Sequence, residues 1–107
     1  MPVYQLARFE VRADARDAAE RAMHEVASYV RRELPDVTWT AYRDPKAPTR
    51  YIAMIRADNP AAAERQRTAS GIQAFDAAIA PLLVGEVALT ECELVTSSDL
   101  QRRHRGR

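Results

Sequence analysis

Cysteine, histidine and glycine are scarce in this chain of 107 residues, which contains one, two and three of them respectively. The single Cys92 has no partner for a disulfide within the chain, and a lone thiol fits a reducing compartment, so we expect a cytoplasmic protein. With so few cysteines and histidines, a zinc site with the usual ligands is not expected, and we predict no metal site.

Long hydrophobic runs are absent as well. No apolar segment reaches the roughly 18 residues that cross a bilayer, so we expect no membrane association. The opening MPVYQLARFEVR lacks the long apolar stretch of a secretory signal, and no signal is expected. The chain also has no Walker loop, no G-x-G-x-x-G and no H-E-x-x-H, so nucleotide-dependent and zinc-protease functions find no support.

A strong excess of one charge is missing, because 16 basic and 15 acidic residues leave a net charge of +1. The last six residues nevertheless contain four arginines, without which 12 basic residues face 15 acidic ones. We predict a domain over residues 1–97 and a solvated basic tail over residues 98–107. A short basic tail on a mildly acidic body argues against a nucleic-acid partner. If the tail does bind nucleic acid, binding should depend strongly on salt and be lost on removal of residues 102–107.

Apolar periodicity is what the chain does contain. Alternation with period two, bounded by turn residues, predicts strands over residues 3–11, 37–44, 50–57 and 86–95. Helical spacing predicts helices over residues 14–34, 60–67 and 70–82. Asp14 is the expected N-cap of the first helix, and Ser70-Gly71 the hinge between the last two. The order β-α-β-β-α-β predicts an α+β ferredoxin-like fold, a four-stranded antiparallel sheet with helices on one face.

Large apolar side chains occur on both faces of the predicted strands, although helices can cover only one face of such a sheet. In the second strand, for example, Trp39 and Tyr42 have opposite parity. A large exposed apolar face usually marks an interface, so we expect a homodimer whose sheets meet face to face. Arg8, Glu10 and Arg56 would then line a partly polar lumen, which is a candidate ligand site.

Two stretches and the order of elements carry a resemblance to a known family. The stretches are RYIAMIRADNPAAAERQRTASGIQAF, which contains S-x-x-x-x-F, and the closing EVALTECELV. Together they resemble the antibiotic biosynthesis monooxygenase domain of the dimeric α+β barrel superfamily, over about residues 3–96. The resemblance implies a homodimeric barrel and, for an enzyme, oxidation of an aromatic or polyketide-like small molecule. No metal or organic cofactor would be required.

Many members of that family carry a histidine in the helix after the third strand, and this chain does not. Gln66 and Arg67 stand at the corresponding place in AERQRTAS. The two histidines are His24, expected at the surface of the first helix, and His104 in the tail. Haem ligation and histidine-dependent oxygenation are therefore not carried over, and no catalytic residue is assigned.

A cofactor-free oxygenase must bind an electron-rich phenol, stabilise its anion and exclude water. Arginine suits the anion and aromatic side chains suit the ring, so the candidate substrate-binding residues are Arg8, Trp39, Tyr42 and Tyr51. Each of them has a structural alternative. Trp39 can be a core or interface anchor, and Tyr42 and Tyr51 can form a cross-strand aromatic pair. Arg8 can form an intersheet ion pair with Glu10 or Glu91.

Two functions from different classes fit these observations. The first is a small monooxygenase of the antibiotic biosynthesis type that oxidises an aromatic substrate in the barrel lumen. The alternative is a non-catalytic dimeric α+β barrel that serves as a ligand-binding or stress-related module. An enzyme needs polar side chains that converge on a cavity, whereas a scaffold can fill its lumen with packed side chains. The geometry of the folded chain therefore bears directly on the choice.

Overall fold

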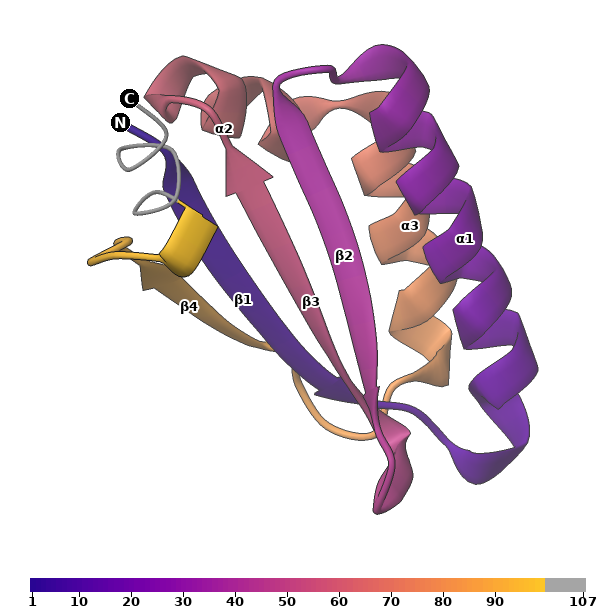
Figure 1. The fold of residues 1–107 in the computed structure, drawn as a ribbon. Helices are drawn as coiled ribbons and strands as arrows, with labels where there is room; N and C mark the ends of the chain where they lie inside the picture. Colours follow the sequence, from indigo (N-terminus) through magenta and orange to yellow (C-terminus); the bar gives the residue numbers. More distant parts are fainter. Residues whose placement is uncertain (100–107) are drawn as a thin grey trace.

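Four strands form one sheet in the computed structural model of this protein, which describes residues 1–99 (Figure 1). The strands are β1 (Val3–Glu10), β2 (Val37–Asp44), β3 (Ala47–Ala57) and β4 (Ala88–Cys92). Their order in the sheet is β2-β3-β1-β4, and each neighbouring pair is antiparallel. The predicted α+β ferredoxin-like fold is confirmed. Residues 100–107, most of the predicted basic tail, lie outside the described residues.

The helices lie on one side of this sheet. They are α1 (Arg16–Glu33), α2 (Pro60–Thr68) and α3 (Ser70–Ile79), with 3-10 turns η1 (Ala13–Ala15) and η2 (Ala80–Leu82). Figure 1 shows α1 and α3 next to each other, with α2 at the end of the sheet where β3 finishes. No helix within residues 1–99 has the length and apolarity needed to cross a bilayer.

Strand parity decides which side chains form the core. The odd-numbered residues of the three longer strands face the helices, and Phe9 and Tyr51 among them are buried. Ala7, Ala53 and Ala41 lie opposite one another across β1, β3 and β2, so small side chains fill the middle row. The predicted apolar stripe of α1 packs on this face through Ala19, Ala22, Met23, Val26 and Val30. Burial of each large side chain stabilises the fold by about 1.5–3 kcal/mol.

The opposite face of the sheet carries the even-numbered residues, and no described helix covers it. We call it the uncovered face; its members include Tyr4, Leu6, Arg8, Glu10, Tyr42, Ile52, Met54 and Arg56. Leu6 lies opposite Met54, and Arg8 lies opposite Ile52, so aliphatic side chains occupy its centre. The prediction that Arg8, Glu10 and Arg56 share one face is confirmed.

Two strands differ in length from their predictions. β3 begins at Ala47 because the hairpin turn is short, and the Asp44 carboxylate closes that turn by accepting from the Lys46 amide at 2.9 Å. β4 ends at Cys92, opposite Tyr4 near the start of β1, and farther along the chain it has no partner strand. In the turn that precedes β4, Gly85 has a φ of 76°. Glycine adopts this left-handed conformation without steric cost.

The helix boundaries also differ at two predicted positions. Asp14 is not the N-cap of α1, because η1 precedes the helix and places Ala15 at the boundary instead. The break between α2 and α3 falls at Ala69, whose backbone is extended, rather than at Ser70-Gly71. The start of α2 follows its sequence signal, since the Asn59 side chain accepts from the Ala62 amide at 2.8 Å and Pro60 follows.

Candidate functional site

The four predicted substrate-binding residues do not share one face of the sheet. Arg8 and Tyr42 belong to the uncovered face, whereas Trp39 and Tyr51 face the helices. The register places Tyr42 opposite Ile52 and Tyr51 opposite Arg43, so the alternative of a Tyr42–Tyr51 cross-strand pair is wrong. Successive side chains of a strand point to opposite faces, which separates the two tyrosines.

Three of the four nevertheless meet at a groove between α1 and β2, which has a volume of about 540 Å³. Trp39 and Tyr51 enter it from the helix side of the sheet, and Tyr42 lines it from the neighbouring position on edge strand β2. The other lining residues are Glu20, Met23, His24, Ala27, Thr40, Ala41 and Arg43. A volume of this size suits a small organic molecule, since ligand pockets run from about 300 to 1,000 Å³.

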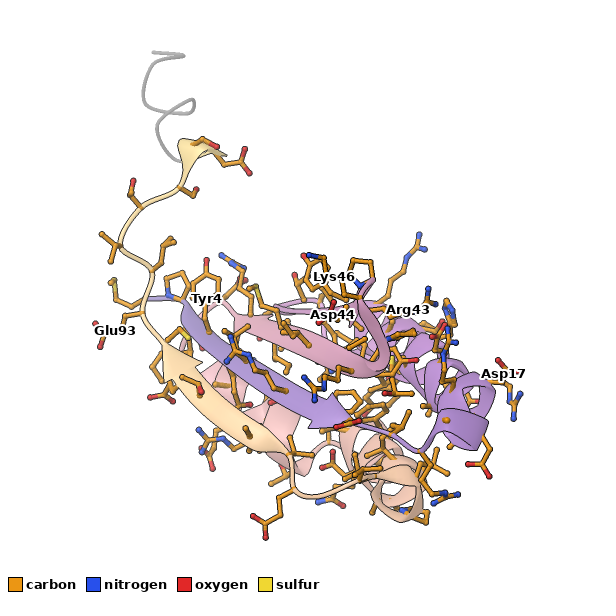
Figure 2. The ribbon with its side chains drawn as sticks, turned by 90° about the horizontal axis from the view of Figure 1, so that it is seen from below. Tyr4, Asp17, Arg43, Asp44, Lys46 and Glu93 are labelled. Atoms are coloured by element: carbon orange, nitrogen blue, oxygen red, sulfur yellow. The ribbon has the colours of Figure 1, made fainter. Side chains whose placement is uncertain are left out.

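A hydrogen-bonded network closes one end of the groove. The Glu20 carboxylate accepts from both the Nε and the Nη2 of Arg43, at 3.0 and 2.7 Å. The Oε2 oxygen of Glu20, which accepts from the Nε of Arg43, also accepts from the Tyr51 hydroxyl at 2.6 Å. Figure 2 shows Arg43 near the β2–β3 hairpin, at the opposite end of the sheet from Tyr4. The network therefore joins α1, β2 and β3 at one end of the groove.

The electrostatics of this network favour an ionised Glu20 and a neutral Tyr51. Hydrogen bonds from Arg43 and then from Tyr51 lower the pKa of Glu20 below its ordinary value. Burial, followed by the bond to Glu20, raises the pKa of Tyr51. The hydrogen bond to Glu20 also raises the pKa of Arg43. The carboxylate is thus charged, and the buried phenol remains a hydrogen-bond donor.

Two of the groove's aromatic residues also belong to the core. Trp39 packs edge-on against Phe75 of α3, with ring centroids 5.4 Å apart. Tyr51 stacks on Phe9 with centroids 5.7 Å apart, and its residue is 3% exposed. Tyr42, in contrast, is 55% exposed. The core contacts of Trp39 and Tyr51 therefore hold their side chains in place, whereas the exposed side chain of Tyr42 is less restrained.

Arg8 lies away from this groove. Within one chain, Glu10 pairs with Arg50 at 3.6 Å and Glu91 pairs with Arg67 at 4.0 Å. Arg8 is exposed on the uncovered face and lines a second hollow of about 430 Å³ near the end of β1. The alternative of an ion pair between Arg8 and Glu10 or Glu91 of the facing sheet stays a prediction.

Glu20 and Arg43 are the groove residues that the sequence analysis missed. Arg43 shares its parity with Trp39 and Ala41, which marks a charged side chain on the helix-facing side of its strand. Glu20 borders the apolar stripe of α1, next to Ala19. A charge on an inward-facing strand position needs a partner, and that requirement could have pointed to Glu20.

His24 is exposed, as predicted, and lies one helical turn from Glu20 at the edge of the groove. The other histidine, His104, lies outside the described residues. Within residues 1–99, no three histidine, cysteine, aspartate or glutamate side chains are grouped as metal ligands would be.

Several solved structures of bacterial proteins have the same architecture. The Rv0793 protein of Mycobacterium tuberculosis superposes with a TM-score of 0.81 at 21% identity, over 92% of this chain and 99% of that one. A candidate antibiotic biosynthesis monooxygenase from Caulobacter crescentus CB15 gives a TM-score of 0.83 at 16% identity, over 89% and 91% of the two chains. A candidate monooxygenase of the same name from Nitrosomonas europaea gives 0.81 at 13% identity, over 90% and 100%.

This chain has the fold of proteins named as candidate antibiotic biosynthesis monooxygenases. The resemblance recognised in the sequence is therefore confirmed at the level of the fold. No family model matches the sequence, and no curated protein matches it. Similarity of fold at such low identity leaves the reaction to be argued from the side chains.

In this chain, Gln66 and Arg67 of α2 stand where the resemblance implies a histidine. Gln66 of α2 is 7% exposed and packs toward the sheet, while Arg67 is exposed. The space that Gln66 shares with Gln5 and Ile55 measures about 10 Å³. That is about the volume needed for a single water. A haem or a polycyclic ligand does not fit between α2 and the sheet in this conformation.

Proposed function

We propose that this protein is a small monooxygenase of the antibiotic biosynthesis type that oxidises an aromatic or polyketide-like phenol. The observation that carries the proposal is the groove between α1 and β2, where Trp39, Tyr42, Arg43 and His24 line one space of about 540 Å³. Likeness of fold to proteins named as candidate antibiotic biosynthesis monooxygenases supports the reaction class. The substrate is placed in the groove rather than on the uncovered face, because the groove is complete within one chain.

Each groove residue has a task in this reaction. The ring of the phenol lies against Trp39, which offers aromatic surface on the helix-facing side of β2. His24 accepts the phenol proton, because an imidazole nitrogen that lines the groove can act as a general base. Arg43 stabilises the resulting phenolate through its N–H groups. Glu20 holds Arg43 in place and does not touch the reacting atoms.

The chemistry balances without an added reductant. An electron-rich phenolate gives electrons to dioxygen, and an activated ring methylene becomes a carbonyl. One oxygen atom of dioxygen forms the new C=O bond, and the other leaves as water with the two methylene hydrogens. The substrate supplies all the electrons, so we propose that neither a metal nor an organic cofactor takes part. The free Cys92 fits the proposed cytoplasmic location.

The assembly we propose is a homodimer that covers the uncovered face. Leu6, Ile52 and Met54 lie at the centre of this face, where a second copy would bury them. Arg8 would then lie in the lumen between the two sheets. Its guanidinium makes no ion pair within residues 1–99, which makes it a further contact for an anionic ligand that enters the lumen.

A thermal-shift panel followed by an oxygen-uptake assay tests the function. The panel contains polycyclic phenols, quinones, flavin and haem, since a ligand that binds the folded state raises its apparent stability. We expect stabilisation by phenols and oxygen uptake with the phenol that binds best. Stabilisation by haem or flavin would overturn the cofactor-free proposal.

Variants locate the activity. We expect His24→Gln to lower the rate of oxygen uptake by about 100-fold, the usual contribution of a general base. Arg21→Gln is the matched control, because Arg21 is an exposed residue of α1 outside the groove lining. Oxygen uptake by His24→Gln at the wild-type rate would contradict the role of His24 as the general base.

A non-catalytic ligand-binding barrel is the second candidate, and one observation favours it. Gln66 fills the place of the family's histidine and leaves a space of about 10 Å³. Such a module would show thermal shifts with aromatic ligands but no oxygen uptake above the uncatalysed rate. The same pair of assays therefore separates the two candidates.

A further inference from the structure

We infer that the ligand of the groove is an aromatic acid, in which a carboxylate attached to the ring system is recognised by Arg43. This inference deepens the proposed function and rests on its assignment of the groove. It adds to the phenolate a second anionic group, a carboxylate that stays charged throughout the reaction, shares the N–H groups of Arg43 with the phenolate and fixes the orientation of the ring.

Arg43 is held in a way that leaves part of its guanidinium for a ligand. Its Nε and Nη2 atoms donate to the two oxygens of Glu20, at 3.0 and 2.7 Å. A guanidinium has five N–H donors, and the two N–H groups on Nη1 are not needed for the bidentate contact with Glu20. The Arg43 side chain is 47% exposed, so a ligand in the groove can reach it. A guanidinium that is fixed in advance loses little conformational entropy when it binds a carboxylate.

The Glu20 carboxylate does not repel an anionic ligand strongly, because its charge is already matched. Three hydrogen bonds from Arg43 and Tyr51 occupy its two oxygens. Arg16 adds a second positive charge that acts on the same carboxylate. Glu20 and the two arginines that act on it therefore carry an excess of one positive charge. This sign complements a ligand carboxylate.

The regular part of the β2–β3 ladder reaches as far as Arg43 and directs its side chain at this site. The register shifts between Arg43 and Asp44, so Arg43 lies opposite Tyr51 while Asp44 lies opposite Ala47. Because the irregularity begins only after Arg43, this side chain keeps the helix-facing direction of Trp39 and Ala41. Asp44 caps the hairpin turn through the Lys46 amide, and Arg43 remains with Glu20 on α1.

The remainder of the groove suits the ring of such an acid. Met23, Ala27 and Ala41 provide apolar surface, and Trp39 provides aromatic surface. Trp39 is also the single tryptophan of the chain. Because the chain has no other tryptophan, its tryptophan fluorescence comes from Trp39 alone and reports on the occupancy of this groove.

Two probes that differ in charge test the inference: anthraquinone-2-carboxylate and its neutral isostere anthraquinone-2-carboxamide. Each is titrated into the full-length protein while quenching of Trp39 fluorescence is followed. We expect the carboxylate to bind about 10-fold more tightly than the amide, as one charge-assisted hydrogen-bonded contact provides. Equal affinity for the two probes would overturn the inference.

Three variants separate recognition from structural damage. Arg43→Gln should remove the preference for the carboxylate while the amide still binds. Glu20→Gln should reduce the preference, because Arg43 is then held less firmly; this positioning role predicts no loss of amide binding. Arg21→Gln, the matched control, should keep the wild-type ratio. A preference that survives in Arg43→Gln would overturn the assignment of Arg43.

The result also distinguishes this inference from the proposed function. Binding with the expected preference, but without oxygen uptake for any phenolic acid, supports recognition of the acid and contradicts the monooxygenase. Oxygen uptake with neutral phenols, but equal affinity for the two probes, supports the enzyme and contradicts the inference. Failure of both probes to quench Trp39 contradicts ligand binding in the groove altogether.

Discussion

At the scale of single residues, parity and burial explain what each predicted site residue does. Trp39 and Tyr51 serve both the core and the groove: Trp39 packs on Phe75 of α3, Tyr51 stacks on Phe9 of β1, and both residues line the groove. Arg8 lies on the opposite face of the sheet from Trp39 and Tyr51. Alternation along a strand could have predicted that separation, but it could not have predicted that Tyr42 lines the groove from its position on the edge strand.

The Glu20 network gives a prediction on pH. The pKa of Glu20 is lowered in the folded protein, chiefly by the hydrogen bond from Arg43, from an ordinary value of 4.5. Its ionised form therefore contributes stability that is present above pH 4.5 and is lost as the pH falls through the folded-state value. Glu20→Gln should be less stable than wild type at neutral pH, and the difference should shrink in acid. Urea unfolding at several pH values measures this; a difference independent of pH would contradict the network.

Gly71 gives a second prediction at this scale. It lies in α3, and a Cβ atom at this position would overlap the ring of Tyr29 on α1. Gly71→Ala should therefore destabilise the fold by about 1–3 kcal/mol through overpacking, despite the better helix propensity of alanine. Thermal unfolding measures the loss. In a Tyr29→Ala background the same substitution should cost much less, and an unchanged cost there would show that the ring is not the obstacle.

At the scale of elements, the sequence predicted β2 in full because its alternation is clean and breakers stand at both ends. It overestimated β4, since the pattern over residues 86–95 does not reveal where β1 stops offering a partner. The length of a paired strand depends on both strands, so the sequence of β4 alone does not predict where its pairing with β1 ends. The groove was missed for the same reason, because it needs the contact between α1 and β2.

Capping of α2 gives the prediction that belongs to this scale. The helix is 9 residues long and contributes Ala62 and Gln66 to the buried surface, so tertiary packing supports it weakly. Asn59→Ala removes the acceptor for the Ala62 amide and should destabilise the protein by about 1 kcal/mol. Chemical unfolding followed by circular dichroism tests this. Asn59→Asp, which keeps an acceptor, should restore most of the loss; failure to do so would assign the effect to something other than the cap.

At the scale of the whole molecule, the uncovered face predicts self-association. Ile52 lies at the centre of that face, so Ile52→Glu should convert a dimer into a monomer by placing a charge in the interface. Leu89→Glu is the matched control, because Leu89 is a 62% exposed residue of the sheet on the other face. Light scattering over a range of concentrations gives the oligomeric state. A wild-type protein that stays monomeric at every concentration would rule out the barrel.

The most direct test of the whole account is oxygen uptake by the wild-type protein and by Arg43→Gln, with 1,8-dihydroxyanthrone as substrate. The account predicts one dioxygen consumed for each carbonyl formed, at a rate well above that of the uncatalysed reaction. Arg43→Gln should be slower by about 10-fold or more, because the phenolate loses a charged donor. Uptake at the uncatalysed rate by a folded protein that binds this phenol in the groove would contradict the monooxygenase and leave a ligand-binding barrel.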